Sequence, residues 1–325
     1  MELNFDSLKI NLESEATRIA DFIKNNVVHT FRKKGAVVAV SGGIDSSTTA
    51  ALCVRALGKD HVYALLLPER DSSPESTRYG KMLVEHLGIP YEITEIEPIL
   101  EAMGCYRYRD EAIKGVFPEY SPSCKSKIVL PEIADQGPSL NYYSIVIETP
   151  DGIQKSKRLP LRNYLQIVAA TNMKQRTRKS LEYFHADRLN YVVAGTPNLL
   201  EYDQGFFVKL GDGAADIKPI AHLFKSQVYA MARHLGLPAE LCNRKPTTDT
   251  YSLEQSQEEF YFRVSHEILD LVLLGVSKGL EAADISKSVG ISPEKTERLM
   301  DDIRQKRTTT APLHLQPLTL HSQSF

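Results

Sequence analysis

Short runs of apolar residues alternate along this chain with longer stretches in which apolar residues recur at helical spacing. Runs typical of buried parallel strands lie at residues 37–40, 61–68, 91–96 and 190–194. Helical spacing predicts helices over residues 11–33, 48–57, 76–87, 161–184 and 225–234. The order strand, helix, strand predicts an α/β fold with a doubly wound, mainly parallel sheet and flanking helices, the Rossmann-like arrangement.

Two parts of the chain depart from this order. Prolines recur through 104–160, where alternating segments at 141–148 and 153–159 flank a Thr-Pro-Asp-Gly turn and predict a β-hairpin. After residue 255 the pattern predicts helices at 255–274, 282–289 and 293–305, followed by an extended tail. We expect a single domain over 1–325, with an insertion at 104–160 and a helical C-terminal subregion at 255–310.

The first predicted strand ends in small polar residues. It is followed by Ser41, Gly42 and Gly43, and then by Asp45, Ser46 and Ser47, which open the next helix. A strand that turns into a helix leaves backbone N–H groups at the positive helix end, where phosphate oxygens bind. Because like charges repel, Asp45 is better suited to bind magnesium than phosphate. An ordinary Gly-Gly turn is the alternative interpretation, and no Walker loop occurs in the sequence.

A second dense polar stretch, 195–228, follows the fourth predicted strand. It contains Glu201, Lys209, an acidic glycine-rich turn at 211–216, and Lys225 at the start of a predicted helix. The turn is not a dinucleotide fingerprint, since Asp216 stands where the third glycine would be.

The end of the second predicted strand, 69–73, is expected beside the phosphate loop, because ligands bind at the carboxyl ends of parallel strands. Arg70, in this segment, is expected to contact either a nucleotide or solvent.

Composition excludes several classes of function. Lys and Arg total 39 against 41 Asp and Glu, so there is no electrostatic argument for a nucleic acid or membrane partner. The helical pattern near residues 279–303 resembles a helix-turn-helix but lacks a basic recognition helix. Four scattered cysteines without a C-x-x-C pair, and an N terminus without a signal pattern, favour a reduced cytoplasmic protein without structural zinc.

Several ordered motifs together resemble the ammonia-dependent NAD synthetases, a family of ATP pyrophosphatases. The motifs are SGGIDS at 41–46, N-x-K-x-R at 172–176, GTxNxxE at 195–201, K-x-GDGAAD at 209–216, LxKxQV at 223–228, K-P-T-x-D at 245–249 and Lys306-Arg307. In that family a substrate carboxylate attacks the α-phosphorus of ATP, giving an acyl adenylate and pyrophosphate. Ammonia then forms the amide and releases AMP. ATP would thus be a co-substrate and Mg²⁺ the cofactor.

The resemblance also implies roles for single residues. Asp45 and Glu201 match the magnesium ligands, and Asp45, Lys209 and Lys225 the catalytic groups. The positions that match ATP contacts are Ser41, Gly42, Gly43, Asp45, Ser46, Ser47, Thr196, Lys225 and Thr247. The positions that match contacts to deamido-NAD (nicotinic acid adenine dinucleotide) are Arg176, Lys209, Asp216 and Lys306. Thr196 and Thr247 are alternatively helix caps or turn residues.

Two departures leave the acceptor open. The family's Tyr-Gly-Gln stretch after the second strand is replaced here by 68–73, and the 104–160 segment is absent from its shorter members. The same chemistry on another carboxylate and a nucleotide-binding relative without turnover therefore remain alternatives. The chain has no recognisable glutaminase motif, so ammonia would be free or delivered by a separate glutaminase. The resemblance further implies a homodimer with substrate bound partly across the interface.

Overall fold

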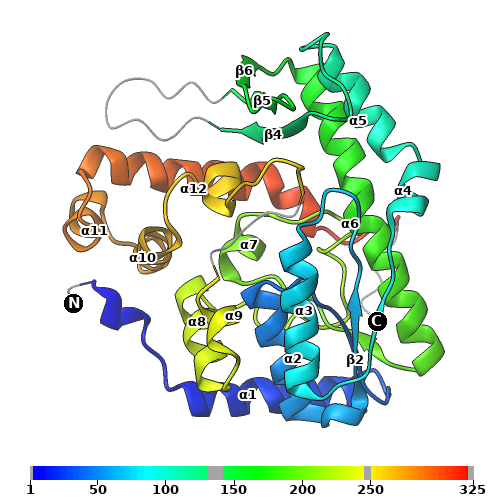
Figure 1. The fold of residues 1–325 in the computed structure, drawn as a ribbon. Coiled ribbons are helices and arrows are strands. Elements are labelled where there is room, and N and C mark those ends of the chain that lie inside the picture. The colour runs from blue at the N-terminus through cyan, green and yellow to red at the C-terminus, as the bar shows by residue number, and fades with distance from the viewer. Residues whose placement is uncertain (1–2, 131–141, 245–249, 321–325) are drawn as a thin grey trace.

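The computed structural model describes residues 3–130, 142–244 and 250–320. Its centre is a four-stranded parallel sheet in the order β3-β2-β1-β7 (Figure 1). The strands are β1 (Ala36–Ala39), β2 (Val62–Leu66), β3 (Tyr91–Ile93) and β7 (Val192–Val193). All four predicted strands are confirmed: β1 has the predicted length and begins one residue earlier, and the other three are shorter than predicted. From β1 the chain moves outward to β2 and β3 and later returns to β7 on the other side of β1, so the strand order reverses between β1 and β7.

Helices cover both faces of this sheet. One face carries α1 (Leu12–Asn25), continued by a π-helical turn (Asn26–Thr30), together with α2 (Ile44–Leu57), α3 (Pro74–Leu87), α8 (Lys225–His234) and α9 (Ala239–Cys242). The other carries α4 (Glu97–Ala102), α5 (Cys105–Lys114) and the long α6 (Leu161–Leu189). This arrangement confirms the predicted doubly wound α/β fold. Short 3₁₀ turns lie at Phe5–Leu8 and Lys59–His61.

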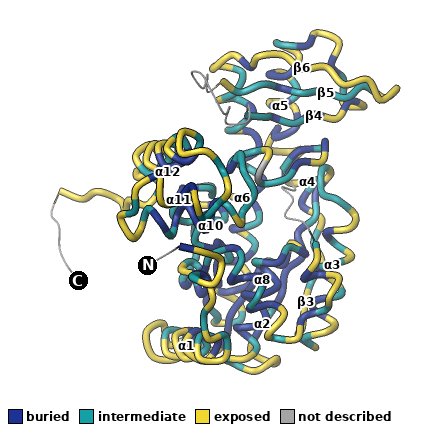
Figure 2. The backbone as a smooth tube through the Cα atoms, turned by 90° about the vertical axis from the view of Figure 1, so that its left-hand side faces the viewer, coloured by how far each residue is buried: buried dark blue, intermediate teal, exposed yellow. Residues whose placement is uncertain are grey.

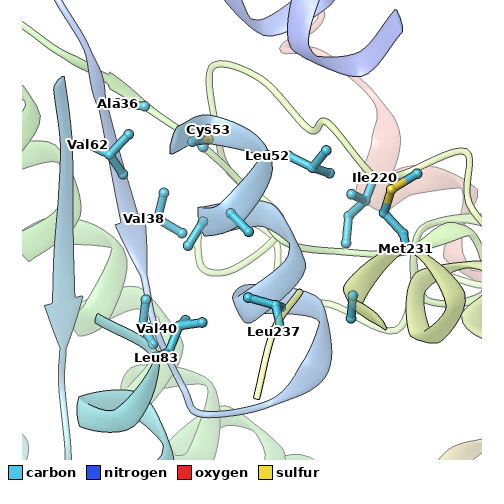
Figure 3. Packing of buried hydrophobic residues seen from close by; sticks show 14 of the residues in the cluster. Ala36, Val38, Val40, Leu52, Cys53, Val62, Leu83, Ile220, Met231 and Leu237 are labelled. Carbon is cyan, nitrogen blue, oxygen red and sulfur yellow. The ribbon is translucent and has the colours of Figure 1, made fainter. Parts of the chain in front are cut away.

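Alternate residues of β1 pack into two different hydrophobic clusters, one on each face of the sheet. Ala36 and Val38 belong to one cluster with Cys53 and Leu52 of α2, and Figure 3 shows Leu52 on the far side of that helix, pointing toward Ile220. This cluster is the deeply buried centre of the molecule in Figure 2. Val37 points the other way, into the cluster built by α4, α5 and α6. A strand buried on both faces has a continuous apolar run in its sequence, which explains why β1, β2 and β7 were predictable.

A second, antiparallel sheet stands at the top of Figure 1. It has the order β4-β5-β6, with β4 (Lys125–Val129), β5 (Ser144–Glu148) and β6 (Gln154–Arg158). The predicted hairpin is confirmed as β5 and β6, with Glu148 paired to Gln154. Strand β4 was not predicted, because its Lys-Ser-Lys start hides an inward face that includes the buried Ile128. That 104–160 is an insertion, and that the whole chain is one domain, stay predictions.

A buried charge network joins α5 and α6 to the end of β2. The Nζ atom of Lys174 donates to Glu69 Oε1 at 3.0 Å, to Asp71 Oδ2 at 2.7 Å and to the carbonyl of Thr250 at 2.9 Å. Arg109 of α5 forms an ion pair with the same Asp71 carboxylate. Glu69 and Asp71 belong to the stretch that departs from the family pattern, and here they bind these buried cations.

The C-terminal part is helical, with two differences from prediction. The single helix expected over 255–274 is wrong: a π-helical turn (Glu258–Phe262) and α10 (His266–Ser277) are separated at Arg263, whose φ of 67° lies in the left-handed region. The helix at 282–289 is confirmed as α11 (Ala282–Val289). Helix α12 runs from Pro293 to His314. The prediction of an extended tail after residue 305 is therefore wrong up to His314.

The end of α12 is held by the segment that follows α7 (Leu199–Asp203). Arg307 donates to both carboxylate oxygens of Asp203 at 2.9–3.1 Å, and Lys209 Nζ donates to the carbonyl of Pro312 at 3.1 Å. Gly205 has a φ of 70°, and a Cβ there would lie 2.3 Å from the Cβ of Thr310. Among the described residues, no helix is long and apolar enough to cross a membrane.

Replacing Lys174 tests the buried network. Lys174→Ala leaves the carboxylates of Glu69 and Asp71 short of a buried cation, so we expect the free energy of unfolding to fall by about 3–5 kcal/mol. Urea denaturation measures this, with Lys114→Ala on the exposed face of α5 as a control that changes stability by about 0.5 kcal/mol or less. Equal effects of the two substitutions would show that the network does not stabilise the fold.

Candidate active site

The carboxyl ends of β1 and β7 open onto a cavity of about 830 Å³. This is the point where the strand order reverses, the usual ligand position in doubly wound sheets. Much of the wall comes from the loop after β1, the inner face of α6, residues 194–212, residues 250–263 and the C-terminal half of α12, and residues 65–77 and the start of α8 also contribute. One continuous space therefore connects the predicted phosphate loop to the C-terminal helices.

The loop after β1 has the geometry expected of a phosphate cradle. Gly42 has a φ of 73°, and a Cβ there would lie 2.4 Å from the carbonyl oxygen of Ser76, so only glycine fits. The hydroxyls of Ser46 and Ser47 donate to the carbonyl of Gly43 at 3.1 and 2.8 Å, which tightens the first turn of α2. The residues of this loop that line the cavity are Ser41, Gly43, Ile44, Asp45 and Ser46. Gly42 and Ser47 lie behind them.

The carboxylate of Asp45 is bound by side chains from two distant parts of the chain. Lys225 Nζ forms an ion pair with Oδ2, and Asn198 Nδ2 donates to Oδ1 at 2.9 Å. Asn198 also caps α7, because its Oδ1 accepts the N–H of Glu201 at 3.2 Å while Glu201 Oε2 accepts the N–H of Asn198 at 3.2 Å. The predicted residues Asp45, Glu201 and Lys225 therefore meet at the inner end of the cavity.

Helix α8 brings Lys225 to this place because its N terminus is capped from another helix. The carboxylate of Asp270, on α10, accepts the backbone N–H groups of Lys225 and Ser226 at 3.2 and 2.8 Å. Asp270 is fully buried, and this burial raises the pKa of its carboxyl group. The position of Lys225 thus depends on packing between α8 and the C-terminal helices.

Charges in this group act strongly on one another. The pKa of Glu201 is raised to about 7, mainly by burial and in addition by the negative charge of Asp45, while the positive charge of Lys225 opposes both effects. Burial alone would lower the pKa of Lys225, but the carboxylates of Asp45 and Glu201 raise it above its usual value. Lys225 is therefore protonated and Glu201 sits close to its titration point at neutral pH.

Asp45 and Glu201 form a donor set suited to Mg²⁺ bound together with phosphates. No cluster of three or more His, Cys, Asp or Glu side chains with metal-binding geometry occurs among the described residues. Magnesium commonly takes one or two protein carboxylates and completes its shell with water and substrate phosphate oxygens. Two carboxylates beside a phosphate cradle fit that pattern.

The other end of the cavity contains the residues predicted to hold the acceptor. Arg176 Nε donates to the backbone carbonyl of Lys209 at 3.3 Å, and Lys306 Nζ lies 2.7 Å from Asp302 Oδ2. Arg176, Lys209, Lys306 and Thr196 all line the cavity. Thr247 lies outside the described residues.

Two polar residues highlighted by the sequence lie elsewhere. The carboxylate of Asp216 accepts the N–H of Val193 at 2.7 Å and the hydroxyl of Tyr183 at 3.3 Å, which anchors β7. Arg70 lies over the ring of Tyr106, 3.6 Å from its centroid. Neither is part of the cavity wall. A substrate contact of Asp216 stays a prediction.

Comparison with known proteins identifies the family. A family model described as NAD synthase matches residues 15–119 and 136–310. The chain belongs to the NAD synthase family. It is 52% identical over 312 residues to the NH(3)-dependent NAD(+) synthetase of Rhizobium meliloti (strain 1021), covering 96% of this chain and 93% of that protein. It is 34% identical over 281 residues to the enzyme of the same name from Thermotoga maritima, covering 86% and 91%.

Solved structures share the NAD synthase fold of this chain. The NH3-dependent NAD synthetase of Campylobacter jejuni superposes with a TM-score of 0.64 at 23% identity, covering 96% of this chain and all of that one. The NMN synthetase of Francisella tularensis gives a TM-score of 0.66 at 20% identity, covering 98% and 100%.

Sequence reasoning missed part of the wall of this NAD synthase cavity. Lys179 and Glu182 of α6 and Asp212 of the glycine-rich turn line the cavity. A signal for the two α6 residues was present: the inward positions Ile167, Thr171 and Lys174 continue at helical spacing toward residue 182. Charged residues on an inward helical stripe indicate a polar cavity rather than a solvated face.

The raised pKa of Glu201 predicts a pH-dependent stability. Because folding raises this pKa from 4.5 to about 7, the folded metal-free protein loses stability as pH rises through that range. Glu201→Gln mimics the protonated form, so it should be more stable than wild type at pH 8, by at most about 3 kcal/mol, and similar below pH 4.5.

Thermal unfolding without Mg²⁺ at several pH values measures this difference. Glu85→Gln, at an exposed position of α3, makes the same chemical change and should show no such trend. A stability difference between Glu201→Gln and wild type that is constant with pH would contradict the prediction.

Proposed function

We propose that this chain is an ammonia-dependent NAD synthetase. It converts deamido-NAD, ATP and ammonia to NAD, AMP and pyrophosphate through an acyl adenylate. The observation that carries the proposal is the meeting of Asp45, Glu201 and Lys225 beneath a phosphate cradle, at one end of a cavity whose other end contains cationic residues. Membership of the NAD synthase family and the 52% identity to a protein of this name support it.

The adenylation step requires the α-phosphorus of ATP to face the substrate carboxylate. The cradle formed by Ser41, Gly43 and Ser46 suits the leaving pyrophosphate, because helix N–H groups and hydroxyls neutralise its charge. Lys225 is held protonated and suits the phosphates of ATP. We propose that Asp45 and Glu201 hold Mg²⁺, which when bound would offset the charge of the phosphates. Catalysis is then mainly positioning and charge neutralisation.

The amidation step requires the adenylate to stay in reach of ammonia. We propose that Arg176, Lys209 and Lys306 hold the dinucleotide, since all three place cationic groups in the wall at the far end of the cavity. The amines of Lys209 and Lys306 already bind protein oxygens. Lys209 binds the end of α12, and Lys306 binds the carboxylate of Asp302. Ammonia comes from solution or from a separate glutaminase.

We also propose that the protein acts as a homodimer in the cytoplasm. Large apolar side chains are exposed along helices that contact one another: Ile99 of α4 and Met103 directly after it, Tyr108 of α5, and Leu161 and Leu165 of α6. Such a patch favours a protein partner, and a second copy of the chain is the simplest one. The four cysteines are free and buried, which fits a reducing compartment.

The direct test measures pyrophosphate release with ATP, Mg²⁺ and ammonium, with and without deamido-NAD, and identifies the products by mass. We expect release that depends on deamido-NAD, with NAD and AMP formed in equal amounts. Turnover of another pyridine carboxylate, such as the mononucleotide, in preference to deamido-NAD would favour the alternative acceptor. A folded protein that binds ATP but releases no pyrophosphate with any carboxylate would favour the inactive nucleotide-binding relative.

Asp45→Asn removes the charge shared by Lys225 and the proposed metal site. We expect turnover to fall by about 100-fold or more, because charge stabilisation is lost at the reacting phosphates, while the circular dichroism spectrum stays unchanged. Asp21→Asn, at an exposed position of α1, is the matched control and should retain wild-type turnover. Near-normal activity of Asp45→Asn would remove this residue from the mechanism.

A further inference from the structure

A buried ion pair on the cavity wall has no part in the adenylation step. Lys179 and Glu182 lie one turn apart on the inner face of α6, with Nζ 2.6 Å from Oε2. Only 5% and 4% of these residues are exposed, yet both line the cavity. A buried ion pair adds little net stability, because the cost of desolvation offsets the attraction between the charges. Its presence at the reaction cavity suggests a chemical role.

Two more charged groups act on Glu182: Asp212 from another part of the chain and Arg178 from α6 itself. Asp212, in the turn that begins near Lys209, accepts the N–H of Val208 at 2.8 Å, and its negative charge acts on Glu182. Arg178 Nε donates to the carbonyl of Leu67 at the end of β2. Burial raises the pKa of Glu182, and Asp212 raises it further, against the opposing charges of Lys179 and Arg178.

The ion pair lies between the two ends of the proposed reaction. Arg176, which lines the acceptor end, is on the same helix one turn before Lys179. The residue after Glu182 is Tyr183, whose hydroxyl donates to Asp216 beside β7, the strand that leads to Thr196 of the proposed ATP end. Lys179 and Glu182 therefore line the same cavity as Arg176 of the acceptor end and Thr196 of the proposed ATP end.

The amidation step needs a proton acceptor at this place. Ammonium, the main form at neutral pH, has no lone pair and has to lose one proton before its nitrogen attacks the carbonyl carbon. The C–N bond then forms, the bond from that carbon to the phosphate oxygen of AMP breaks, and a second proton leaves the nitrogen. Acyl adenylate and ammonium thus give amide, AMP and two protons.

We propose that Glu182 is the general base of the amidation step and that Lys179 positions its carboxylate. This inference rests on the proposed function. Lys179 holds Oε2, and Oε1 takes the first proton from ammonium, giving ammonia and the neutral carboxylic acid. The second proton leaves with AMP or to solvent. A carboxylate whose pKa is raised is a better base for this task than an exposed one.

Two nucleophiles separate this role from a structural one. Hydroxylamine is largely uncharged at neutral pH and gives a hydroxamate without prior deprotonation. In single turnovers from preformed adenylate, Glu182→Gln should amidate about 100-fold more slowly than wild type with ammonium, and within about threefold of wild type with hydroxylamine. Pyrophosphate formation in the first half-reaction should be unchanged, which also shows that the variant is folded.

Matched variants complete the experiment. Glu182→Asp keeps the charge but withdraws the carboxylate, and should give an intermediate loss with ammonium alone. Glu85→Gln should behave as wild type with both nucleophiles. Equal loss of Glu182→Gln activity with both nucleophiles would show a structural role, and no loss with ammonium would show none; either overturns the inference. If wild-type protein forms no pyrophosphate with deamido-NAD, the proposed function itself fails, and the inference fails with it.

Discussion

The ion pair between Lys225 and Asp45 is the contact on which the rest of this structure depends. A carboxylate beside a phosphate cradle is repelled by the ligand that the cradle binds, so it needs a cation close by. That cation comes from α8, whose N terminus is fixed by Asp270 of α10. The C-terminal part therefore reaches the inner end of the cavity through the buried carboxylate of Asp270 and also through Gln257, whose Nε2 donates to Glu201 Oε1 at 2.9 Å. In this sense the helical subregion is part of the active site rather than an appendage.

The short strands of the central sheet supply the rigidity that this contact needs. Strands β1, β2 and β7 have residues buried on both faces, and alternate side chains of β1 belong to different clusters, whereas the edge strand β3 has no buried residue. The loops after β1 and β7 consequently start from strands that are packed on both faces. The helices that follow these loops, α2 and α7, hold the carboxylates of Asp45 and Glu201 near one another, and Asn198 hydrogen-bonds to both.

Sequence patterns were informative wherever the structure is determined locally. The parallel strands, the hairpin of β5 and β6, and the loop at 41–47 follow from apolar runs, turn residues and small polar residues that act within a few positions. Strand β4 and the last turns of α12 did not, because each depends on partners far away in sequence. Lys-Ser-Lys becomes strand by pairing with β5, and Pro312 stays in a helix whose end is bound by Lys209.

The candidate site divides in the same way. Asp45 and Lys225 were predictable since their motifs are contiguous, whereas the inward positions of Lys179 and Glu182 depend on which face of α6 meets the sheet. Arg70, which was left open between a nucleotide and solvent, lies over the ring of Tyr106, and Asp216, whose substrate contact stays a prediction, anchors β7. Residue type alone does not distinguish a group that binds substrate from one that binds the protein's own backbone.

The close approach of Gly205 to Thr310 has a consequence for divergence within the family. These residues are distant in sequence, but a side chain at position 205 would overlap the one at position 310. Any relative that gains a side chain at the first position has to lose volume at the second, or move α12 away from the cavity. The two positions are thus expected to change together, and a sequence alignment that shows paired substitutions would record how the C-terminal helix has shifted during evolution.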